Sequence, residues 1–388
     1  MKKLLFSLVV FTLILAGCSN PAGNDNTTDN QPTVPGDFPE IHKIDEILLN
    51  FYEKYQLPGG ISLAISYNEK LVYSGSVGYA DRQHNKELTP EYRMRIASLS
   101  KPITSIAIMK LMEENKLSLD ERVFGEDGIF NNEYGMPIYN NNPIDITVKQ
   151  LLEHSAGGWG NSRNDPMFML HEYDGKELIT RVLANYSLTN LPGTNYDYSN
   201  FGYYILGRVI EKKSNTTYES YVKEKILKLA GINGMRIGSN SYVADEAEYI
   251  SFQEEGNPYS LRPVHMDSHG GWVANPVEIL KLLVRVDGFS NVKDILDFQT
   301  IQTMITPSSV NRYYALGWSV NQNNNWWHTG SLPGTSAEMA RSSNGFNWVI
   351  LINYRPSTST LEKFQSDMDQ IFWKVFEAVE MWPIGADL

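Results

Sequence analysis

The sequence contains a single cysteine, Cys18, which excludes an intramolecular disulfide. It is also poor in positive charge, because 33 Lys and Arg residues stand against 45 Asp and Glu residues, for a net charge of −12. This balance disfavours binding to nucleic acid and electrostatic docking on anionic lipid. We therefore expect no nucleic-acid partner. The motifs of the chain, rather than its charge, lead us to expect neither a metal nor another cofactor.

Long hydrophobic runs are scarce as well, and the clearest one, over residues 4–14, is too short to span a membrane. Two lysines precede it, and Leu-Ala-Gly-Cys follows it, which is typical of an export signal with a small-residue cleavage site. The segment resembles the bacterial lipobox, and this resemblance implies a diacylated Cys18 at the mature N-terminus. We therefore predict a lipoprotein signal peptide over residues 1–17.

Residues 18–38 are predicted to form a flexible tether, because they are rich in Asn, Thr, Pro, Gly and Asp and nearly free of apolar side chains. Acyl chains on Cys18 would hold the protein at a membrane surface while leaving its body in water. Removing residues 1–17 takes away two lysines, which leaves 31 basic against 45 acidic residues and a net charge of −14. The expected location is the extracytoplasmic side of a bacterial cell envelope, on its membrane.

Residues 39–388 are expected to form the folded domain, and 42% of the chain is hydrophobic, which suffices for a substantial core. Apolar spacing predicts a helix over 41–55. Two β-rich runs, over 61–67 and 71–77, flank a short polar turn and predict a hairpin. A buried helix is predicted over 103–114.

The middle of the chain, roughly residues 120–265, has a different character. Short helical patterns alternate there with Asn, Gly and Pro clusters, and no strand pair stands out; the predicted helices cover 147–154, 177–185, 201–212 and 218–229. The later elements are a helix over 276–286, β-like runs over 314–321, 326–329, 337–341 and 348–354, and a last helix over 361–379. Strands at both ends of the chain predict an α+β fold, with an antiparallel sheet flanked by helices and an inserted helical lobe.

The pattern S-x-x-K occurs three times, beginning at Ser98, Ser220 and Ser290. A serine at a helix N-terminus with a lysine one turn later places an amine beside the hydroxyl, where it can assist deprotonation. Ser98 meets this requirement, because the buried helix follows it and Pro102 falls in the first turn. Ser220 lies in a charged amphipathic pattern and Ser290 in a Gly/Asn loop. Ser98 is therefore the predicted nucleophile, with Lys101 as its partner.

The pattern Y-x-N occurs as Tyr198-Ser199-Asn200 and again at Tyr139 in an Asn-rich loop that should be solvated. The first copy stands just before a predicted helix. A phenol can relay a proton if neighbouring cations lower its pKa from about 10 toward neutrality. We predict Tyr198 as a proton carrier and Asn200 as a group that binds the substrate or orients the lysine.

The triplet His328-Thr329-Gly330 lies on a predicted strand and is followed by Ser331. A strand beside the nucleophile can supply a backbone N–H, here that of Ser331, which together with the N–H of Ser98 would form an oxyanion hole. Gly330 would permit close approach of a substrate backbone. These four residues are predicted to bind the substrate.

The order S-x-x-K, then Tyr or Ser with Asn two residues later, then K-T-G is the signature of β-lactamases and penicillin-binding proteins. This chain has Ser98-x-x-Lys101, Tyr198-x-Asn200 and His328-Thr329-Gly330 in the same order. The sequence resembles the branch with tyrosine in the second motif, which holds class C β-lactamases, D,D-peptidases and related esterases. Further matches cover residues 61–81, 146–155, 270–272 and 316–318, and the resemblance spans roughly residues 40–380. It implies a β-lactamase/transpeptidase-like fold and an acyl-enzyme on Ser98, with Lys101 and Tyr198 sharing the proton transfers.

One departure concerns the third motif, which usually begins with lysine in this family. Lysine presents a permanent cation to a substrate carboxylate, whereas His328 is expected to be largely neutral at pH 7. The departure therefore favours a small-molecule or peptide substrate, namely an ester, an amide or a D-amino-acid peptide. The alternatives are a class C-like β-lactamase and a non-catalytic sensor or cell-wall binder of the penicillin-recognising fold. The intact set of Ser98, Lys101, Tyr198 and Asn200 argues against the binder.

Two other histidine patterns in the sequence could carry chemistry. His265 and His269 have a spacing that could bind zinc on a helix, but no glutamate follows His265 and two glycines break the helix, which favours a polar loop. His154 is predicted to cap or pack its helix rather than to titrate.

Overall fold

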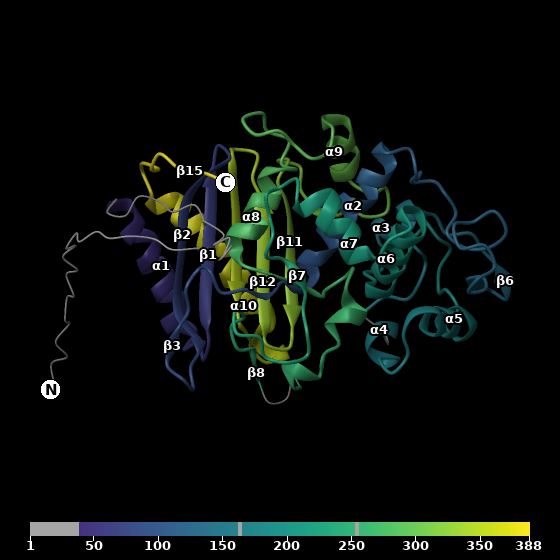
Figure 1. Cartoon of the computed structure of the whole chain (residues 1–388), viewed down its shortest axis with the longest axis horizontal. Helices are drawn as coiled ribbons and strands as arrows, with labels where there is room; N and C mark the ends of the chain where they lie inside the picture. Colours follow the sequence, from purple (N-terminus) through teal and green to yellow (C-terminus); the bar gives the residue numbers. More distant parts are fainter. Residues whose placement is uncertain (1–38, 162–164, 253–255) are drawn as a thin grey trace, which may run out of the picture. The chain divides into compact units, whose positions relative to one another are not determined.

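The computed structural model describes residues 39–161, 165–252 and 256–388 (Figure 1). The signal peptide predicted over 1–17, the lipidated Cys18 and the tether over 18–38 lie outside the described residues and stay predictions. Within the described part, no helix combines the length and apolarity needed to cross a bilayer.

An antiparallel sheet forms the centre of the domain, and its strands come from both ends of the chain. The strand order is β10-β11-β12-β13-β1-β2-β15, with β3 paired to β2. The two ends of the chain meet where β1 pairs with β13, with Ile61 opposite Ile352. The strands are β1 (Gly60–Tyr67), β2 (Lys70–Asp81), β3 (Lys86–Glu87), β10 (Ser319–Val320), β11 (Trp326–Leu332), β12 (Thr335–Arg341), β13 (Phe346–Ile352) and β15 (Ala386–Asp387).

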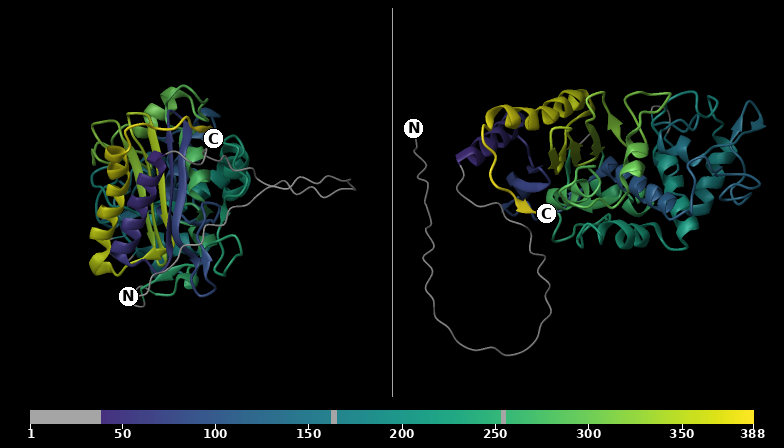
Figure 2. Two further views of the ribbon diagram at one scale, coloured as in Figure 1. Left: turned by 90° about the vertical axis from the view of Figure 1, so that its left-hand side faces the viewer. Right: turned by 90° about the horizontal axis from the view of Figure 1, so that it is seen from above.

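Each face of the sheet packs against helices, because side chains alternate along the strands. Leu63 and Ile350 face a core shared with α1 (Pro39–Tyr55) and α10 (Thr358–Ala378). Val349 and Leu351 face the opposite core, where α8 (Pro276–Val284) contacts β13 and β1. Figure 2 shows α1 and α10 together on one face. The predicted α+β class, with helices flanking an antiparallel sheet, is confirmed.

The hairpin between β1 and β2 closes through two residues in the left-handed region, Asn68 and Glu69, with φ of 49° and 65°. Two positive φ values in a two-residue loop match the turn that suits twisted strands. The buried carboxylate of Glu69 accepts hydrogen bonds from the backbone N–H groups of Asn291 and Val292, at 2.6 and 2.9 Å. The hairpin turn therefore anchors the loop that carries the third S-x-x-K copy.

Helices dominate the region beyond the sheet edge at β10, on the right in Figure 1. They are α2 (Ser100–Glu113), α3 (Val148–Leu152), α4 (Pro166–Met169), α5 (Gly175–Asn185), α6 (Asn200–Ser214), α7 (Tyr218–Val222) with a π-turn over Lys223–Leu227, and α9 (Phe298–Ile305). The sequence predicted no strand pair within 120–265, which is wrong for β5 (Ile138–Tyr139) and β6 (Asn142–Pro143). Strands of two residues are too short to show a period of two.

The remaining strands are small additions outside the main sheet. β9 (Trp272–Ala274) pairs with β4 (Met94–Arg95) and with β7 (Arg236–Ile237), while β14 (Tyr354–Arg355) pairs in parallel with β8 (Ile250–Ser251). β4 leads directly into the turn that carries Ser98, so pairing within this three-stranded sheet positions the backbone just before Ser98.

The strand predicted over 314–321 is wrong over most of its length. Gly317 has a φ of 86°, and the N–H of Ala315 donates to the carbonyl of Trp318 at 2.8 Å. The segment therefore folds back on itself as a tight turn, which pairs Tyr314 with Ser319. Only Ser319–Val320 forms a strand, and Tyr314 is brought beside the third motif.

Candidate active site

Ser98 lies in a 3₁₀ turn, Ala97–Leu99, that leads directly into α2. Ala97 has a φ of 49°, an uncommon conformation for a residue with a side chain. A Cβ on Gly330 would lie 2.5 Å from the carbonyl oxygen of Ile96, so only glycine lets β11 approach this turn so closely. The backbone of the third motif therefore packs directly against the turn that presents Ser98.

Lys101 is fully buried one helical turn after Ser98. Its Nζ lies 3.1 Å from Oγ of Ser98, 2.7 Å from Oδ1 of Asn200 and 3.0 Å from the backbone oxygen of His269. Burial lowers the pKa of Lys101 to about 7, and the negative charge of Asp165 opposes that shift. The amine is therefore available as a base near neutral pH.

The Asn200 side chain is held in one orientation by Asp165. Nδ2 of Asn200 donates to the Asp165 carboxylate at 2.8 Å, and a carboxylate can only accept. Oδ1 of Asn200 must therefore face Lys101. A neutral lysine has two N–H bonds and one lone pair; the N–H bonds point to Asn200 and to the His269 carbonyl, so the lone pair points to Ser98. This geometry lets Lys101 accept the Ser98 proton.

Tyr198 lies beside both groups, with its ring centre 4.6 Å from Nζ of Lys101. Burial raises the pKa of Tyr198 well above its usual value, and a hydrogen bond with the Ser98 side chain only partly opposes the shift. The sequence predicts Tyr198 as a proton relay if neighbouring cations lower its pKa. Because its pKa is raised instead, that condition is not met. Tyr198 stands next to the nucleophile as a protonated phenol.

The third-motif strand, β11, pairs with β12 along its whole length but with β10 only at Trp326 and Trp327. The rest of its other edge contacts the turn that carries Ser98. Thr329 is exposed there, and Ser331 also lines the cavity above Ser98. The strand is thus placed as predicted, and the oxyanion role of the Ser331 N–H stays a prediction.

His328 belongs to a buried chain of hydrogen bonds. The backbone groups at the two ends of this chain determine which nitrogen or oxygen carries each proton. Nδ1 of His154 lies 3.1 Å from the N–H of Ser199, an obligate donor, so Nε2 of His154 carries the hydrogen and donates to the Tyr314 hydroxyl at 3.1 Å. The Tyr314 hydroxyl then donates to Nε2 of His328 at 3.2 Å. Nδ1 of His328 donates to the Thr329 carbonyl at 2.7 Å.

This chain leaves both imidazoles neutral. Burial lowers the pKa of His328 to about 3, with a further contribution from Lys101, and burial lowers the pKa of His154 as well. The predicted neutrality of His328 thus has a structural cause. His154 does pack as predicted, but its ring also sets the proton order of the chain.

The other two S-x-x-K copies lie at the surface, with their serines and lysines exposed. Ser220 is exposed in α7, its Oγ accepts a hydrogen bond from Thr217 at 2.7 Å, and Lys223 pairs with Glu219 at 2.7 Å. The Ser290 copy lies in the loop anchored by Glu69. Ser98 is therefore the copy that has a buried lysine beside it.

A cavity of about 420 Å³ opens above Ser98. Its lining combines residues from the helical region with residues of β11 and of the turn before β10, and among the described residues none that lines it is Lys, Arg, Asp or Glu. The lining residues are Ser98, Asn161, Phe168, Tyr196, Tyr198, Asn200, Met266, His269, Gly270, Tyr314, Ser319, His328, Thr329, Ser331 and Leu332. The cavity lining therefore carries no charged side chain. Lys101, the titratable amine of the site, lies behind Ser98 and outside this lining.

Among the residues that the structure describes, no group of three or more His, Cys, Asp or Glu side chains is suited to a metal ion. His265 lies 3.5 Å from Asp174. His269 contributes its carbonyl to Lys101 while its ring is buried.

Sequence reasoning missed three contributors to this site: Asp165, Tyr314 and the backbone of His269. Asp165 precedes a proline and caps α4, a signal that indicates a helix start but not a contact with Asn200. A carbonyl has no sequence signature, although Gly270-Gly271 marked the segment as unusual. Tyr314 was hidden by the incorrect strand prediction.

Comparisons with known proteins agree with this architecture. The sequence profile described as Beta-lactamase matches residues 44–368. Protein flp of Staphylococcus aureus (strain MW2) is 24% identical over 321 residues, which cover 80% of this chain and 62% of flp. The chain thus spans under two thirds of the length of this curated relative.

Two solved structures show the same fold. The D-amino acid amidase of Ochrobactrum anthropi SV3 superposes with a TM-score of 0.68 at 20% identity, covering 87% of this chain and 98% of the amidase. EstCE1, described as a hydrolase with promiscuous acyltransferase activity, superposes with a TM-score of 0.71 at 18% identity, covering 88% and 99%. The resemblance inferred from the three motifs is confirmed, and the chain belongs to the β-lactamase family, a family of β-lactamase-related hydrolases.

Proposed function

We propose that this protein is a serine hydrolase that forms an acyl-enzyme on Ser98 with an ester, amide or D-amino-acid peptide at the bacterial cell envelope. The observation that carries the proposal is the fixed environment of Lys101. Two acceptors, Asn200 Oδ1 and the His269 carbonyl, occupy its N–H bonds and leave its lone pair for the Ser98 hydroxyl. A plain structural serine has no need of a buried amine with a pKa of about 7.

In the proposed reaction, Oγ of Ser98 attacks the substrate carbonyl carbon while its proton passes to Nζ of Lys101. The N–H groups of Ser98 and Ser331 are proposed to receive the developing oxyanion. The C–O or C–N bond then breaks, and the leaving group takes up a proton from Lys101 through the Tyr198 phenol. Water attacks the acyl-enzyme with the same groups acting in reverse, which releases the acid and restores Ser98.

The neutral third motif supports esters and amides over β-lactams. A β-lactam presents a carboxylate to this wall, and His328, held neutral by Tyr314, offers it no cation. Two structural neighbours are named as a D-amino acid amidase and a promiscuous hydrolase and acyltransferase. A class C-like β-lactamase remains the second candidate within the family, and nitrocefin turnover separates the two.

The cell-envelope location rests on the signal pattern at residues 1–17 and on the lipobox cysteine. A protein expressed in a bacterial host and extracted from its membranes should carry a diacylglycerol on Cys18, detected as the mass of the N-terminal peptide. Cys18→Ser should release the protein from the membrane fraction. An unmodified Cys18 in the exported wild type would contradict the anchor while leaving the catalytic proposal in place.

Labelling with a fluorophosphonate probe tests the nucleophile. The wild type should react with one equivalent of probe and hydrolyse p-nitrophenyl acetate, and Ser98→Ala should do neither. Ser220→Ala is the matched control, since it removes the serine of another S-x-x-K copy and should retain both activities. Label that persists on Ser98→Ala refutes the assignment, and an absence of any acyl-enzyme across esters, amides and β-lactams favours a non-catalytic binder.

A further inference from the structure

Four large apolar side chains near the C-terminus are exposed or partly exposed. Met381 is 68% exposed and Ile384 is 91% exposed, and Trp382 between them is partly exposed. Phe376, in the last turn of α10, is exposed as well, and its ring and that of Trp382 both contact Phe346, with ring centres 5.6 and 4.8 Å away. The four side chains therefore form one surface, which we call the C-terminal apolar surface.

Several exposed apolar groups on one short segment differ from the scattered apolar residues that every protein surface carries. A contiguous group of this kind marks a surface that contacts a partner. Trp382 adds a polar atom, because no described residue accepts a hydrogen bond from its Nε1. An apolar ring with a free N–H suits the boundary between water and a lipid bilayer, where tryptophan is enriched. The composition of the surface thus fits a membrane better than water alone.

The charges on the same segment indicate which lipid the surface suits. The charged residues from 376 to the C-terminus are all acidic and exposed, and they are Glu377, Glu380 and Asp387. Asp387 pairs with Lys70 at 2.9 Å, which neutralises one of them. Acidic side chains do not attract anionic headgroups. The attraction to a bilayer would therefore come from the burial of apolar area, and zwitterionic phospholipid is the expected partner.

The C-terminal apolar surface lies beside the point where the predicted tether joins the domain. α1 begins at Pro39, directly after the tether predicted over 18–38. Nζ of Lys43 in α1 donates to the carbonyl of Ala378 at 3.0 Å. The N–H of Glu380 donates to the Glu40 carboxylate at 3.2 Å, and Figure 2 shows the yellow segment after α10 beside the purple α1. Even a fully extended tether reaches only about 70 Å, so an acylated N-terminus would keep this part of the domain near the bilayer.

We propose that the C-terminal apolar surface rests on the lipid bilayer that holds the acylated N-terminus, with Met381, Trp382 and Ile384 entering its headgroup region. This inference rests on the lipid anchor and the cell-envelope location proposed above, and it adds a second, direct contact with the membrane. The contact also orients the active site. β15 forms one end of the sheet, whereas the cavity above Ser98 lies at the other end, where residues of β10 and β11 line it. Contact at the β15 end therefore leaves the cavity on the side away from the lipid.

A fluorescent label on one introduced cysteine tests this contact. Cys18 is the only cysteine of the chain, and its sulfur would carry the diacylglycerol, so an introduced thiol is the one that reacts. Ile384→Cys, labelled in the full lipidated protein, is reconstituted into phosphatidylcholine vesicles that contain a nitroxide-labelled phospholipid. Phe298→Cys is the matched control, because it replaces an exposed apolar residue of α9, which packs against α2 in the helical region. Quenching at Ile384→Cys should exceed that at Phe298→Cys by at least about twofold, since apolar groups at a membrane interface lie about 5–10 Å deep.

Met381→Glu in the labelled Ile384→Cys protein should lower the quenching to the control level, because a carboxylate resists entry into lipid. Equal quenching at the two labelled positions, or an unchanged signal in Met381→Glu, would overturn the proposal. A second copy of the chain on this surface would also overturn it, and would shield the label from aqueous iodide without quenching by the lipid. An unmodified Cys18 would remove the anchor and this inference with it. Hydrolysis of p-nitrophenyl acetate reports on Ser98 independently, so failure of the surface and failure of the hydrolase are distinguishable.

Discussion

The Tyr314 hydroxyl lies 3.2 Å from Nε2 of His328, and this one contact decides what the third motif can offer a substrate. Because the hydroxyl already accepts from His154, its own proton goes to His328. The acceptor nitrogen of His328 is thereby occupied, and its other nitrogen is bound to the Thr329 carbonyl. His328 therefore shapes the wall of the cleft without presenting a charge.

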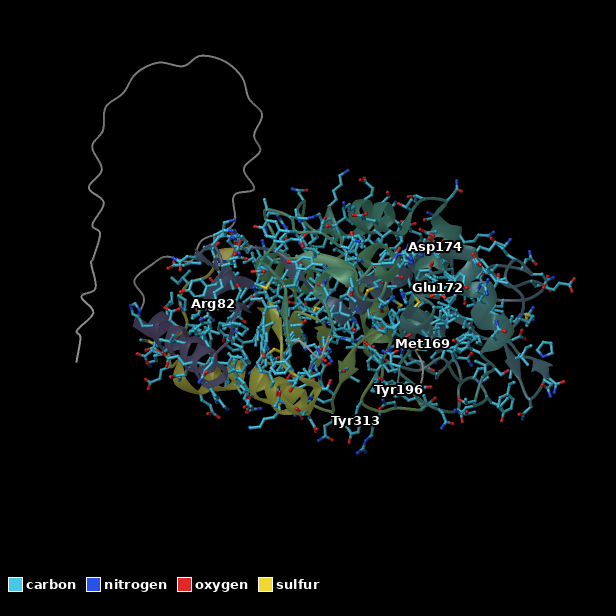
Figure 3. All side chains as sticks on the ribbon, turned by 90° about the horizontal axis from the view of Figure 1, so that it is seen from below. Arg82, Met169, Glu172, Asp174, Tyr196 and Tyr313 are labelled. Atoms are coloured by element: carbon cyan, nitrogen blue, oxygen red, sulfur yellow. The ribbon has the colours of Figure 1, made fainter. Side chains whose placement is uncertain are left out.

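Replacing Tyr314 with phenylalanine should break the chain of hydrogen bonds between His154 and His328 and abolish its fixed arrangement of protons. Two buried histidine nitrogens would lose their partner, which should lower the free energy of unfolding by about 1–3 kcal/mol in urea titrations. We also expect kcat/KM for p-nitrophenyl acetate to fall by about 10-fold, because the third-motif strand loses its support. Tyr313→Phe, at the exposed neighbouring position labelled in Figure 3, is the control and should change neither quantity. Wild-type values in Tyr314→Phe would show that the chain has no positioning role.

The pH dependence of the reaction should follow Lys101. Only the neutral amine can accept the Ser98 proton, and its pKa is lowered to about 7, so kcat/KM should rise as the pH increases through about 7. Lys101→Arg keeps the charge at every accessible pH and should reduce kcat/KM by about 100-fold or more. A pH–rate profile that is flat between pH 5 and 9, or an active arginine variant, would exclude Lys101 as the base.

Asp165→Asn tests how the Asp165 carboxylate, which accepts a hydrogen bond from Asn200, affects the pKa of Lys101. The Asp165 charge raises the pKa of Lys101, so removing it should shift the rising limb of the pH–rate profile to lower pH. The Asn200 amide also loses its charged acceptor, and we expect kcat/KM on the plateau to fall by about 5- to 10-fold. Asp127→Asn, at a side chain that is 85% exposed, should leave the profile in place. A limb that moves to higher pH in Asp165→Asn would reverse the assigned sign.

Much of this site could be predicted because its signals are local. The nucleophile was chosen among three S-x-x-K copies by one criterion, a buried helix directly after Ser98, and α2 begins two residues later. Likewise, the second motif was expected just before a helix because apolar spacing begins there, and in the structure Ser199 caps α6. Caps and apolar periodicity depend on residues only a few positions apart, which is why a single sequence reveals them.

The features that were missed depend on contacts between distant residues. The His269 carbonyl that binds Lys101 comes from 168 residues away, and Asp165 reaches Asn200 across 35 residues. Tyr314 shows a second cause, since a β-rich run containing Gly317 was interpreted as a strand although the glycine turns the chain. The effect of desolvation was missed for the same reason. The raised pKa of Tyr198 comes mainly from burial, and burial depends on contacts between distant residues.

Glu338 should make the stability of the fold depend on pH. It is fully buried in β12 and accepts a hydrogen bond from Nε1 of Trp348 at 2.9 Å; burial raises its pKa to about 8. Because the folded pKa exceeds the unfolded value of about 4.3, the native state holds the extra proton, and stability falls as the pH rises between these values, by up to about 1.4 kcal/mol per pH unit. Glu338→Gln should flatten this dependence in urea unfolding at pH 5 and 8, whereas the exposed Glu177→Gln should not. Parallel curves for Glu338→Gln and wild type would contradict this.

Gly330→Ala tests whether the close packing of β11 on the Ser98 turn matters for catalysis. The added Cβ would meet the Ile96 carbonyl at 2.5 Å and the Ala97 side chain at 3.1 Å, so the turn or the strand must shift. A displacement of even about 1 Å at a nucleophile can cost about 100-fold in rate, and we expect kcat for p-nitrophenyl acetate to fall by about that factor. Gly202→Ala, whose Cβ would find its nearest neighbours at ordinary contact distances of 3.5–3.7 Å, controls for the methyl group itself. If Gly330→Ala folds and keeps wild-type kcat, the third motif does not fix the position of Ser98, because a methyl group cannot fit there without moving one of them.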